Sequence, residues 1–157
     1  MGTDVDDNQG DKVGSVLDEE FYWGTSCDCA FVWDSTNSEI DNKTYLSQGT
    51  QVTVTSYTSA SNQNGDFIYK SGSTDPGVTY GVVTGINKTV WEPFHNPPLY
   101  IKSLVQSNAV HVGGDSGGAV MSGSSIYGVI SSHDSNGYYH VPTDKIMFEL
   151  DVDPVLG

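Results

Sequence analysis

The chain alternates short segments rich in β-branched and aromatic residues with clusters of turn-forming residues. Glycine alone accounts for 18 of the 157 residues, and Asn, Ser, Asp and Pro fill the remaining turns. Closely spaced turns leave little room for long helices, so this pattern predicts an all-β barrel or sandwich. The predicted strands cover residues 13–17, 28–33, 51–57, 66–70, 78–86, 100–105, 119–121, 126–131 and 138–141.

Only the two ends depart from the strand pattern. Near the C-terminus, Thr143 is suited to cap a helix, and Ile146, Met147 and Leu150 share one helical face. Residues 1–11 are acidic and polar, which predicts a flexible arm.

The acidic arm has a partial resemblance to a calcium-binding loop. Asp4, Asp6 and Asn8 alternate as calcium ligands do, but the following glycine falls one place late. Ser15 stands where the loop needs a bidentate glutamate. We therefore expect no calcium site there.

Charge excludes several classes of partner. The chain has 20 acidic residues against 6 lysines and no arginine, giving a formal net charge of -14. Such a surface repels phosphate backbones and anionic lipids, so we expect neither nucleic acid nor a membrane as partner. No apolar run approaches the roughly 18 residues of a membrane span. The first residues lack the charged and apolar stretches of a signal peptide, so none is expected in this chain.

The two cysteines, Cys27 and Cys29, are separated by one residue. In a strand both side chains would point to the same face, and the ring closed by a disulfide would be strained. One such pair is also weak evidence for zinc. We expect two small buried thiols, with no metal and no cofactor.

Residues 113–118, with the sequence GGDSGG, carry the sharpest chemical signal. Ser116 is flanked by glycines, so little shields its hydroxyl. Gly114 lets a bare N–H approach a substrate carbonyl, and the Ser116 N–H can complete an oxyanion hole. An ordinary Gly/Asp/Ser turn is the alternative. A nucleophile elbow of the α/β-hydrolase type is disfavoured, because residues 119–123 predict a strand and turn rather than a helix.

These residues resemble the chymotrypsin-like serine proteases, over about residues 12–150. GDSGG followed by Ala119 and Val120 is similar to their nucleophile strand. The bacterial, streptogrisin-like branch has similar glycine- and threonine-rich strands. The other matching stretches are 28–32 (the aspartate strand), 70–74 and 77–83 (the glycine- and threonine-rich strands) and 128–131 (the strand lining the specificity pocket).

The resemblance implies a double β-barrel with a short C-terminal helix, and peptide hydrolysis through an acyl-enzyme. Ser116 would be the nucleophile, Asp28 would orient a histidine, and Ser131 would pair with the substrate backbone. The substrate would be a peptide or protein, and the enzyme would be secreted. The implied division is an arm (1–11), a remnant of the first barrel with the aspartate (12–45), and a second barrel with the serine and the helix (46–157).

One departure from the family's pattern concerns the general base. The family's order is histidine, aspartate, serine, yet no histidine precedes Asp28, and only 27 residues stand before it. The chain is then a fragment of a longer protease, whose missing N-terminal part supplies the base, or a non-catalytic pseudoprotease or binding module. Alternatively, one of the downstream histidines, of which His133 is best placed, acts as the base. An unrelated acidic adhesin would require both motifs to be coincidental.

The chain's four histidines are His95, His111, His133 and His140. His111 and His133 flank the predicted specificity strand, where they would favour acidic substrate side chains by charge and hydrogen bonding. The alternative is that both are ordinary polar loop residues. His95 and His140 carry no functional argument.

Overall fold

The computed structural model describes residues 4–6, 12–20, 27, 29–34, 42–47, 50–58, 62–74, 78–93 and 98–157. The predicted catalytic aspartate, Asp28, and His95 lie outside the described residues. Within them, the fold is mostly strand with one short C-terminal helix, which confirms the predicted all-β class.

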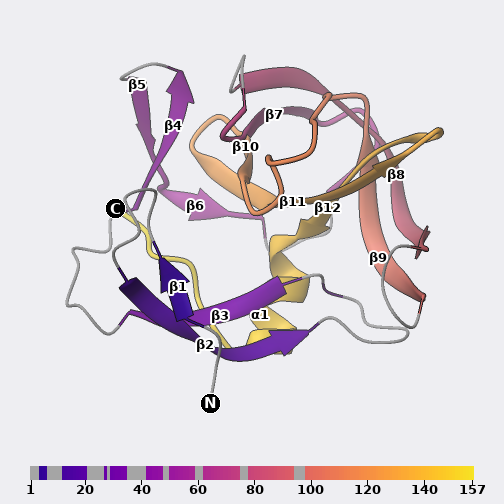
Figure 1. Ribbon diagram of the computed structural model, residues 1–157. Coiled ribbons are helices and arrows are strands. Elements are labelled where there is room, and N and C mark those ends of the chain that lie inside the picture. The colour runs from indigo at the N-terminus through magenta and orange to yellow at the C-terminus, as the bar shows by residue number, and fades with distance from the viewer. Residues whose placement is uncertain are drawn as a thin grey trace.

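Six strands form a closed antiparallel barrel (Figure 1). Their order around the barrel is β10-β7-β8-β9-β12-β11, and pairing of β10 with β11 closes the ring. Closure leaves no unpaired edge among these six strands, which suits a sequence of many short β segments. The strands are β7 (Phe67–Ser71), β8 (Val78–Glu92), β9 (Leu99–Ser107), β10 (Ala119–Ser122), β11 (Ser125–Asp134) and β12 (Gly137–Pro142).

The remaining strands come from the N-terminal part of the chain. Strands β1 (Asp4–Asp6), β2 (Lys12–Glu20) and β3 (Cys29–Asp34) form a three-stranded antiparallel sheet. Strands β4 (Lys43–Ser47) and β5 (Thr50–Thr53) form a separate pair. The short β6 (Ser56–Tyr57) adds to β11 in parallel.

The C-terminal helix α1 (Thr143–Leu150) lies between the three-stranded sheet and the barrel, as Figure 1 shows. It contacts β2 and β3 on one side and β11 and β12 on the other. A core cluster at this junction joins barrel residues to the cysteine segment. Its buried members are Cys27, Val90, Leu99, Ile101, Leu104, Tyr139 and Val141.

The barrel has its own apolar core, which fixes the strand β10 that follows the turn at Ser116. Val120 on β10 and Ile130 on β11 are both almost fully buried. Packing of these side chains holds the start of β10 against β11. The complete buried cluster is Ile68, Val83, Val105, Ala109, Val120 and Ile130.

Two local predictions are corrected at the chain ends. Asp4–Asp6 forms β1 within the segment expected to be an arm, because it pairs with β2. Thr143 does not cap α1. Pro142 is the N-cap without a side-chain hydrogen bond, and the buried Thr143 hydroxyl donates to the Ile126 carbonyl at 3.3 Å. Strand β4 was also not predicted from the sequence.

The expectation of two unlinked thiols is also wrong. Cys27 and Cys29 form a disulfide, with Cα atoms 5.4 Å apart. A fully extended chain would separate them by about 7 Å. Cys27 precedes β3 rather than lying within it, so the geometry expected for two residues of one strand does not apply to this pair.

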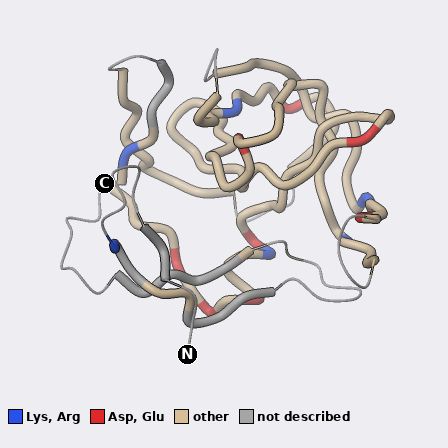
Figure 2. The backbone as a smooth tube through the Cα atoms, in the orientation of Figure 1, with Lys and Arg blue, Asp and Glu red and all other residues tan. Residues whose placement is uncertain are grey.

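Charged positions are distributed over several elements of the described chain rather than gathered on one face (Figure 2). Among the described residues, no helix has the length and apolar character needed to cross a membrane.

Candidate active site

Ser116 lies on the tight turn that leads into β10. Gly114 and Gly117 on either side have φ angles of +101° and +87°, a backbone region that residues with a Cβ adopt only with strain. The side chain of Ser116 is exposed, and its Oγ donates to the Ser131 carbonyl at 3.0 Å. The glycines thus create a turn that presents one hydroxyl at the surface.

Backbone hydrogen bonds tie this turn to β11. The Gly117 N–H donates to the Ile130 carbonyl at 2.9 Å, and the Ile130 N–H donates to the Gly118 carbonyl at 2.8 Å. Ser131 follows Ile130 directly, so these bonds bring it to the turn at Ser116. Sequence reasoning predicted both serines as site residues, and the structure places them in direct contact.

The buried carboxylate of Asp115 stabilises the turn at Ser116 by accepting hydrogen bonds from neighbouring segments. Asp115 is 8% exposed, and its carboxylate accepts hydrogen bonds from the Thr74 N–H at 3.0 Å, the Thr74 hydroxyl and the Val112 N–H at 3.0 Å. Burial by itself would raise the pKa of Asp115, but these hydrogen bonds outweigh it and hold the pKa below its ordinary value. The role of Asp115 is structural, since it joins the segments before and after it.

A group of polar rings surrounds a buried lysine beside this turn. We call Lys70, His111, His133 and Tyr138 the Lys70–His111 cluster. Lys70 is 1% exposed, and its Nζ lies 3.1 Å from His111 Nδ1 and 5.7 Å from the centre of the Tyr138 ring. The His111 ring meets the His133 ring edge to face, with centroids 5.5 Å apart, and the Tyr138 ring at 5.2 Å.

Burial changes the proton affinities within the cluster. Desolvation lowers the pKa of Lys70 to about 7, since removal from water disfavours the ammonium form. Desolvation, with further contributions from Lys70 and His133, lowers the pKa of His111 to about 4. Asp115 and the Ser132 backbone act in the opposite direction on His111. His111 is therefore a neutral imidazole near neutral pH.

The two predicted histidines differ in exposure. His111 is 4% exposed, whereas His133 is exposed. His111 lies outside any helix or strand, so it is a buried loop residue rather than a solvated one.

His140 lies deeper than the cluster. It is fully buried, and its Nε2 is hydrogen-bonded to Asn62 Oδ1 at 2.7 Å. Desolvation, followed by Lys70 and His111, lowers its pKa well below the ordinary value. This neutral histidine is part of the barrel interior.

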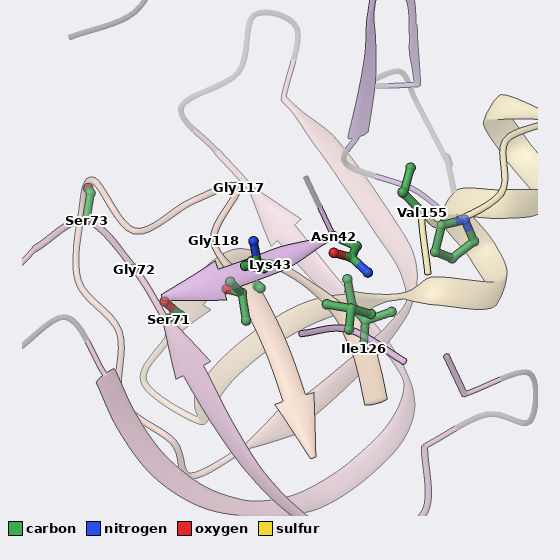
Figure 3. A pocket seen from close by; sticks show the side chains of 13 residues that line it. Asn42, Lys43, Ser71, Gly72, Ser73, Gly117, Gly118, Ile126 and Val155 are labelled. Atoms are coloured by element: carbon green, nitrogen blue, oxygen red, sulfur yellow. The ribbon is translucent and has the colours of Figure 1, made fainter. Parts of the chain in front are cut away.

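A pocket of about 570 Å³ opens on the side of the turn formed by Gly117 and Gly118 (Figure 3). Residues of β4, the end of β7 and the C-terminal segment complete its wall. Members of the Lys70–His111 cluster do not line this pocket. The full lining is Asn42, Lys43, Thr44, Val54, Ser71, Gly72, Ser73, Gly117, Gly118, Ala119, Ile126, Pro154 and Val155.

Sequence reasoning predicted His111 and His133 as site residues and did not include their neighbours Lys70 and Tyr138. The available signal was a lysine placed directly after Ile68 and Tyr69 in an apolar strand, where a charge is unexpected. Within the described part of the chain, no group of three or more His, Cys, Asp or Glu residues is arranged to hold a metal ion.

The chain is similar to a curated protein named Serine protease 2, from Streptomyces fradiae. The two are 33% identical over 109 residues, which is 69% of this chain and 59% of the relative. The chain therefore spans about three fifths of the length of that relative. No protein-family model matches the chain.

Solved structures with the same fold are bacterial proteases. Thermobifida fusca protease A is 24% identical with a TM-score of 0.77, and the match covers 92% of this chain and 75% of that one. Cellulomonas bogoriensis chymotrypsin is 22% identical with a TM-score of 0.75, covering 92% and 76%. A glutamic-acid-specific serine protease that uses a histidine triad in substrate binding is 28% identical with a TM-score of 0.75, covering 95% and 77%.

Proposed function

We propose that this chain, which is related in sequence and fold to the bacterial chymotrypsin-like serine proteases, is the nucleophile-bearing part of a secreted serine endopeptidase. One observation carries the proposal: the exposed Ser116 hydroxyl stands on a glycine turn that is fixed against the strand carrying Ser131. An acyl-enzyme mechanism needs a hydroxyl that a peptide carbonyl can reach, on a backbone that does not move away from it. The substrate is a peptide or protein.

The oxyanion hole is assigned to the backbone N–H groups of Gly114 and Ser116. Among the described residues, neither group has a hydrogen-bond acceptor. The positive φ of Gly114 sets the local turn, and the Ser73 hydroxyl donates to the Gly114 carbonyl at 2.7 Å. Two fixed donors stabilise the negative oxygen that develops as Ser116 attacks.

The general base is assigned to a histidine outside this chain, oriented by Asp28. In the described residues, the Ser116 hydroxyl donates to a backbone carbonyl, and none of His111, His133 and His140 is hydrogen-bonded to it. A serine hydroxyl is a weak nucleophile until a base removes its proton. Acylation by this chain alone is therefore expected to be slower by several orders of magnitude.

Substrate recognition is assigned to Ser131, His111 and His133. Ser131 would pair with the substrate backbone as an added strand. The two histidines would favour an acidic side chain. The 28% identical glutamic-acid-specific protease, which uses a histidine triad in substrate binding, supports this assignment.

The test is labelling by a fluorophosphonate probe with and without added imidazole. The probe phosphonylates an activated serine, and imidazole in solution supplies a base that is small enough to reach it. We expect Ser116 to remain unlabelled with the probe alone and to become labelled as imidazole is added. Labelling should be absent from the variant Ser116→Ala at every imidazole concentration. Mass spectrometry of the digested protein locates the modified residue, and Ser122→Ala serves as the matched control.

Rapid labelling without imidazole would show that this chain supplies its own base. Failure to label at any imidazole concentration would remove Ser116 as the nucleophile. That second outcome favours a non-catalytic binding module on the same scaffold, which shares the barrel and the Lys70–His111 cluster but lacks turnover.

A further inference from the structure

Lys70 is a buried cation without a described carboxylate partner. It is 1% exposed, its Nζ meets the His111 ring nitrogen at 3.1 Å, and the Tyr138 ring face lies 5.7 Å away. Removing an ammonium group from water without a counter-ion is costly. Proteins retain such a group mainly where its charge or its altered proton affinity is used.

The number of hydrogen-bond donors on Lys70 determines which ring nitrogen of His111 carries the proton. An ammonium has three donors and no acceptor, so His111 Nδ1 must accept from Lys70. The proton of the neutral ring then sits on Nε2. That nitrogen is buried and makes no hydrogen bond of good geometry, although the Ser132 backbone lies near enough to raise the pKa of His111. The pair thus combines an uncompensated positive charge with a buried N–H that is poorly satisfied, and a carboxylate supplies what both lack.

We propose that Lys70, acting through His111, is the residue that selects an acidic side chain, glutamate or aspartate, at the substrate position before the cleaved bond. This inference rests on the proposed function. His133 forms the outer part of the site, since it is exposed and its ring meets the His111 ring. It stands two residues after Ser131, whose carbonyl holds the nucleophile's hydroxyl. An acidic side chain entering beside Ser131 therefore reaches His133 first and the His111 N–H next.

The overall charge of the chain makes a local cation necessary. With a net charge of -14, the protein repels an acidic peptide at long range. Selection of a carboxylate must then come from a contact inside the barrel, where low polarity strengthens the attraction of a single positive charge. Lys70 is the lysine that the structure buries in the barrel interior.

Proton affinity gives the site a defined pH range. Below the Lys70 pKa of about 7 the ammonium is charged, and above the His111 pKa of about 4 the imidazole is neutral and donates through Nε2. The other titratable groups around the pair are His133 on β11, Tyr138 and His140 on β12, and Asp115, which acts on His111. Preference for a carboxylate is therefore greatest around pH 5–7 and decreases at higher pH as Lys70 loses its proton.

The experiment measures peptide binding, so it does not depend on turnover. Two acetylated tetrapeptides with free carboxyl termini, Ala-Ala-Ala-Glu and Ala-Ala-Ala-Gln, differ only in the charge of the last side chain. We expect the Glu peptide to bind at least about tenfold more tightly at pH 6 by calorimetry, as a charged hydrogen bond allows. Lys70→Met should reduce this ratio to below about twofold, whereas Lys102→Met, which removes an exposed lysine of β9, should keep it.

A second variant separates charge from packing. Arginine stays protonated at all accessible pH values. Lys70→Arg should therefore retain the preference for Glu at pH 8.5, where the native protein has lost it. Circular dichroism and thermal melting of each variant establish that the barrel is folded.

Equal binding of the two peptides by the native protein, or a preference that persists in Lys70→Met, would overturn the inference. Absence of binding by either peptide would overturn it as well. The proposed function is judged separately, because imidazole-dependent labelling of Ser116 does not require an acidic side chain. Labelling that persists in Lys70→Met while the Glu preference disappears supports both proposals.

Discussion

The turn at Ser116 and the Lys70–His111 cluster lie beside one another, yet they depend on different parts of the chain: one on backbone, the other on side chains. The turn depends on backbone: two glycines with positive φ, hydrogen bonds to β11 and one buried carboxylate beneath it. The cluster depends on side chains from β7, the segment before the turn, β11 and β12, gathered around one buried ammonium.

The comparison predicts that the two regions affect stability with opposite sign. Each contact of Asp115 satisfies a backbone donor or a hydroxyl, so its carboxylate stabilises the fold. Lys70 lacks a described counter-ion and is desolvated, so its charge destabilises the fold. Substitution of each residue should therefore move stability in opposite directions.

The largest expected effect is the loss of Asp115. Asp115→Ala leaves the N–H groups of Thr74 and Val112 without their acceptor, and we expect a loss of about 3 kcal/mol in the free energy of unfolding at pH 7. Because its pKa is lowered in the fold, this contribution is present above the ordinary aspartate pKa and is lost as the pH falls through the folded value. Urea titration followed by tryptophan fluorescence measures it. The exposed Asp153 gives the control, Asp153→Ala, which should change stability by less than about 0.5 kcal/mol.

Removing the charge of Lys70 should increase the free energy of unfolding, whereas removing Asp115 should decrease it. We expect Lys70→Met to raise the free energy of unfolding at pH 6 by about 2 kcal/mol, since an apolar side chain of similar length avoids the desolvation of an ammonium. In the native protein the unfolded chain binds a proton at Lys70 between pH 7 and about 10.5, while the fold does not. Native stability should rise with pH over that range, by up to about 1.4 kcal/mol per unit.

The increase of stability between pH 7 and about 10.5 should be absent from Lys70→Met. It should remain in Lys102→Met, the control that removes an exposed lysine. Urea titrations at pH 6, 8 and 9.5 measure the difference between variants. A Lys70→Met protein that is less stable than the native one at pH 6 would show that Lys70 has a compensating anion.

The smallest expected effect on stability comes from the backbone conformation of Gly114. Gly114→Ala places a Cβ at a φ of +101°, and the nearest atom, Thr74 Cγ2, is at an ordinary distance of 3.6 Å. The cost should then be conformational alone, about 1 kcal/mol. Gly113→Ala is a matched control, because a Cβ there meets nothing within 4 Å and the residue has no positive φ. Equal melting temperatures for the two variants would mean that the turn is not strained at Gly114.

The strand pattern was predictable because it depends on local composition. Eight of the nine predicted segments overlap strands of the structure along most of their length, and the segment 51–57 is divided into β5 and β6 by two residues. Strands β1 and β4 were missed, because polar residues such as Asp4 and Lys43 pair there through backbone bonds that composition does not reveal. The disulfide was missed because the sequence was interpreted with both cysteines in one strand, whereas Cys27 lies outside β3.

The candidate site likewise has features that local sequence predicts and features that only the tertiary structure shows. Glycines around Ser116 indicate a sharp turn in any context, so the exposed turn at Ser116 was predictable from sequence. The sequence predicted Ser116 and Ser131 as site residues but not their contact, which arises from hydrogen bonds between the turn and β11. Lys70 was not found, because a lysine in a strand is ordinarily exposed.

The sequence by itself determined the β-rich fold class, the acidic charge and the glycine turn around Ser116, since strand propensity, net charge and backbone freedom are properties of residues and their near neighbours. Only the tertiary structure decided that Lys70 is buried against His111. Closing the barrel brings β7 beside β10 and directs that side chain inward, where the surroundings, not the residue type, determine its charge and its partner.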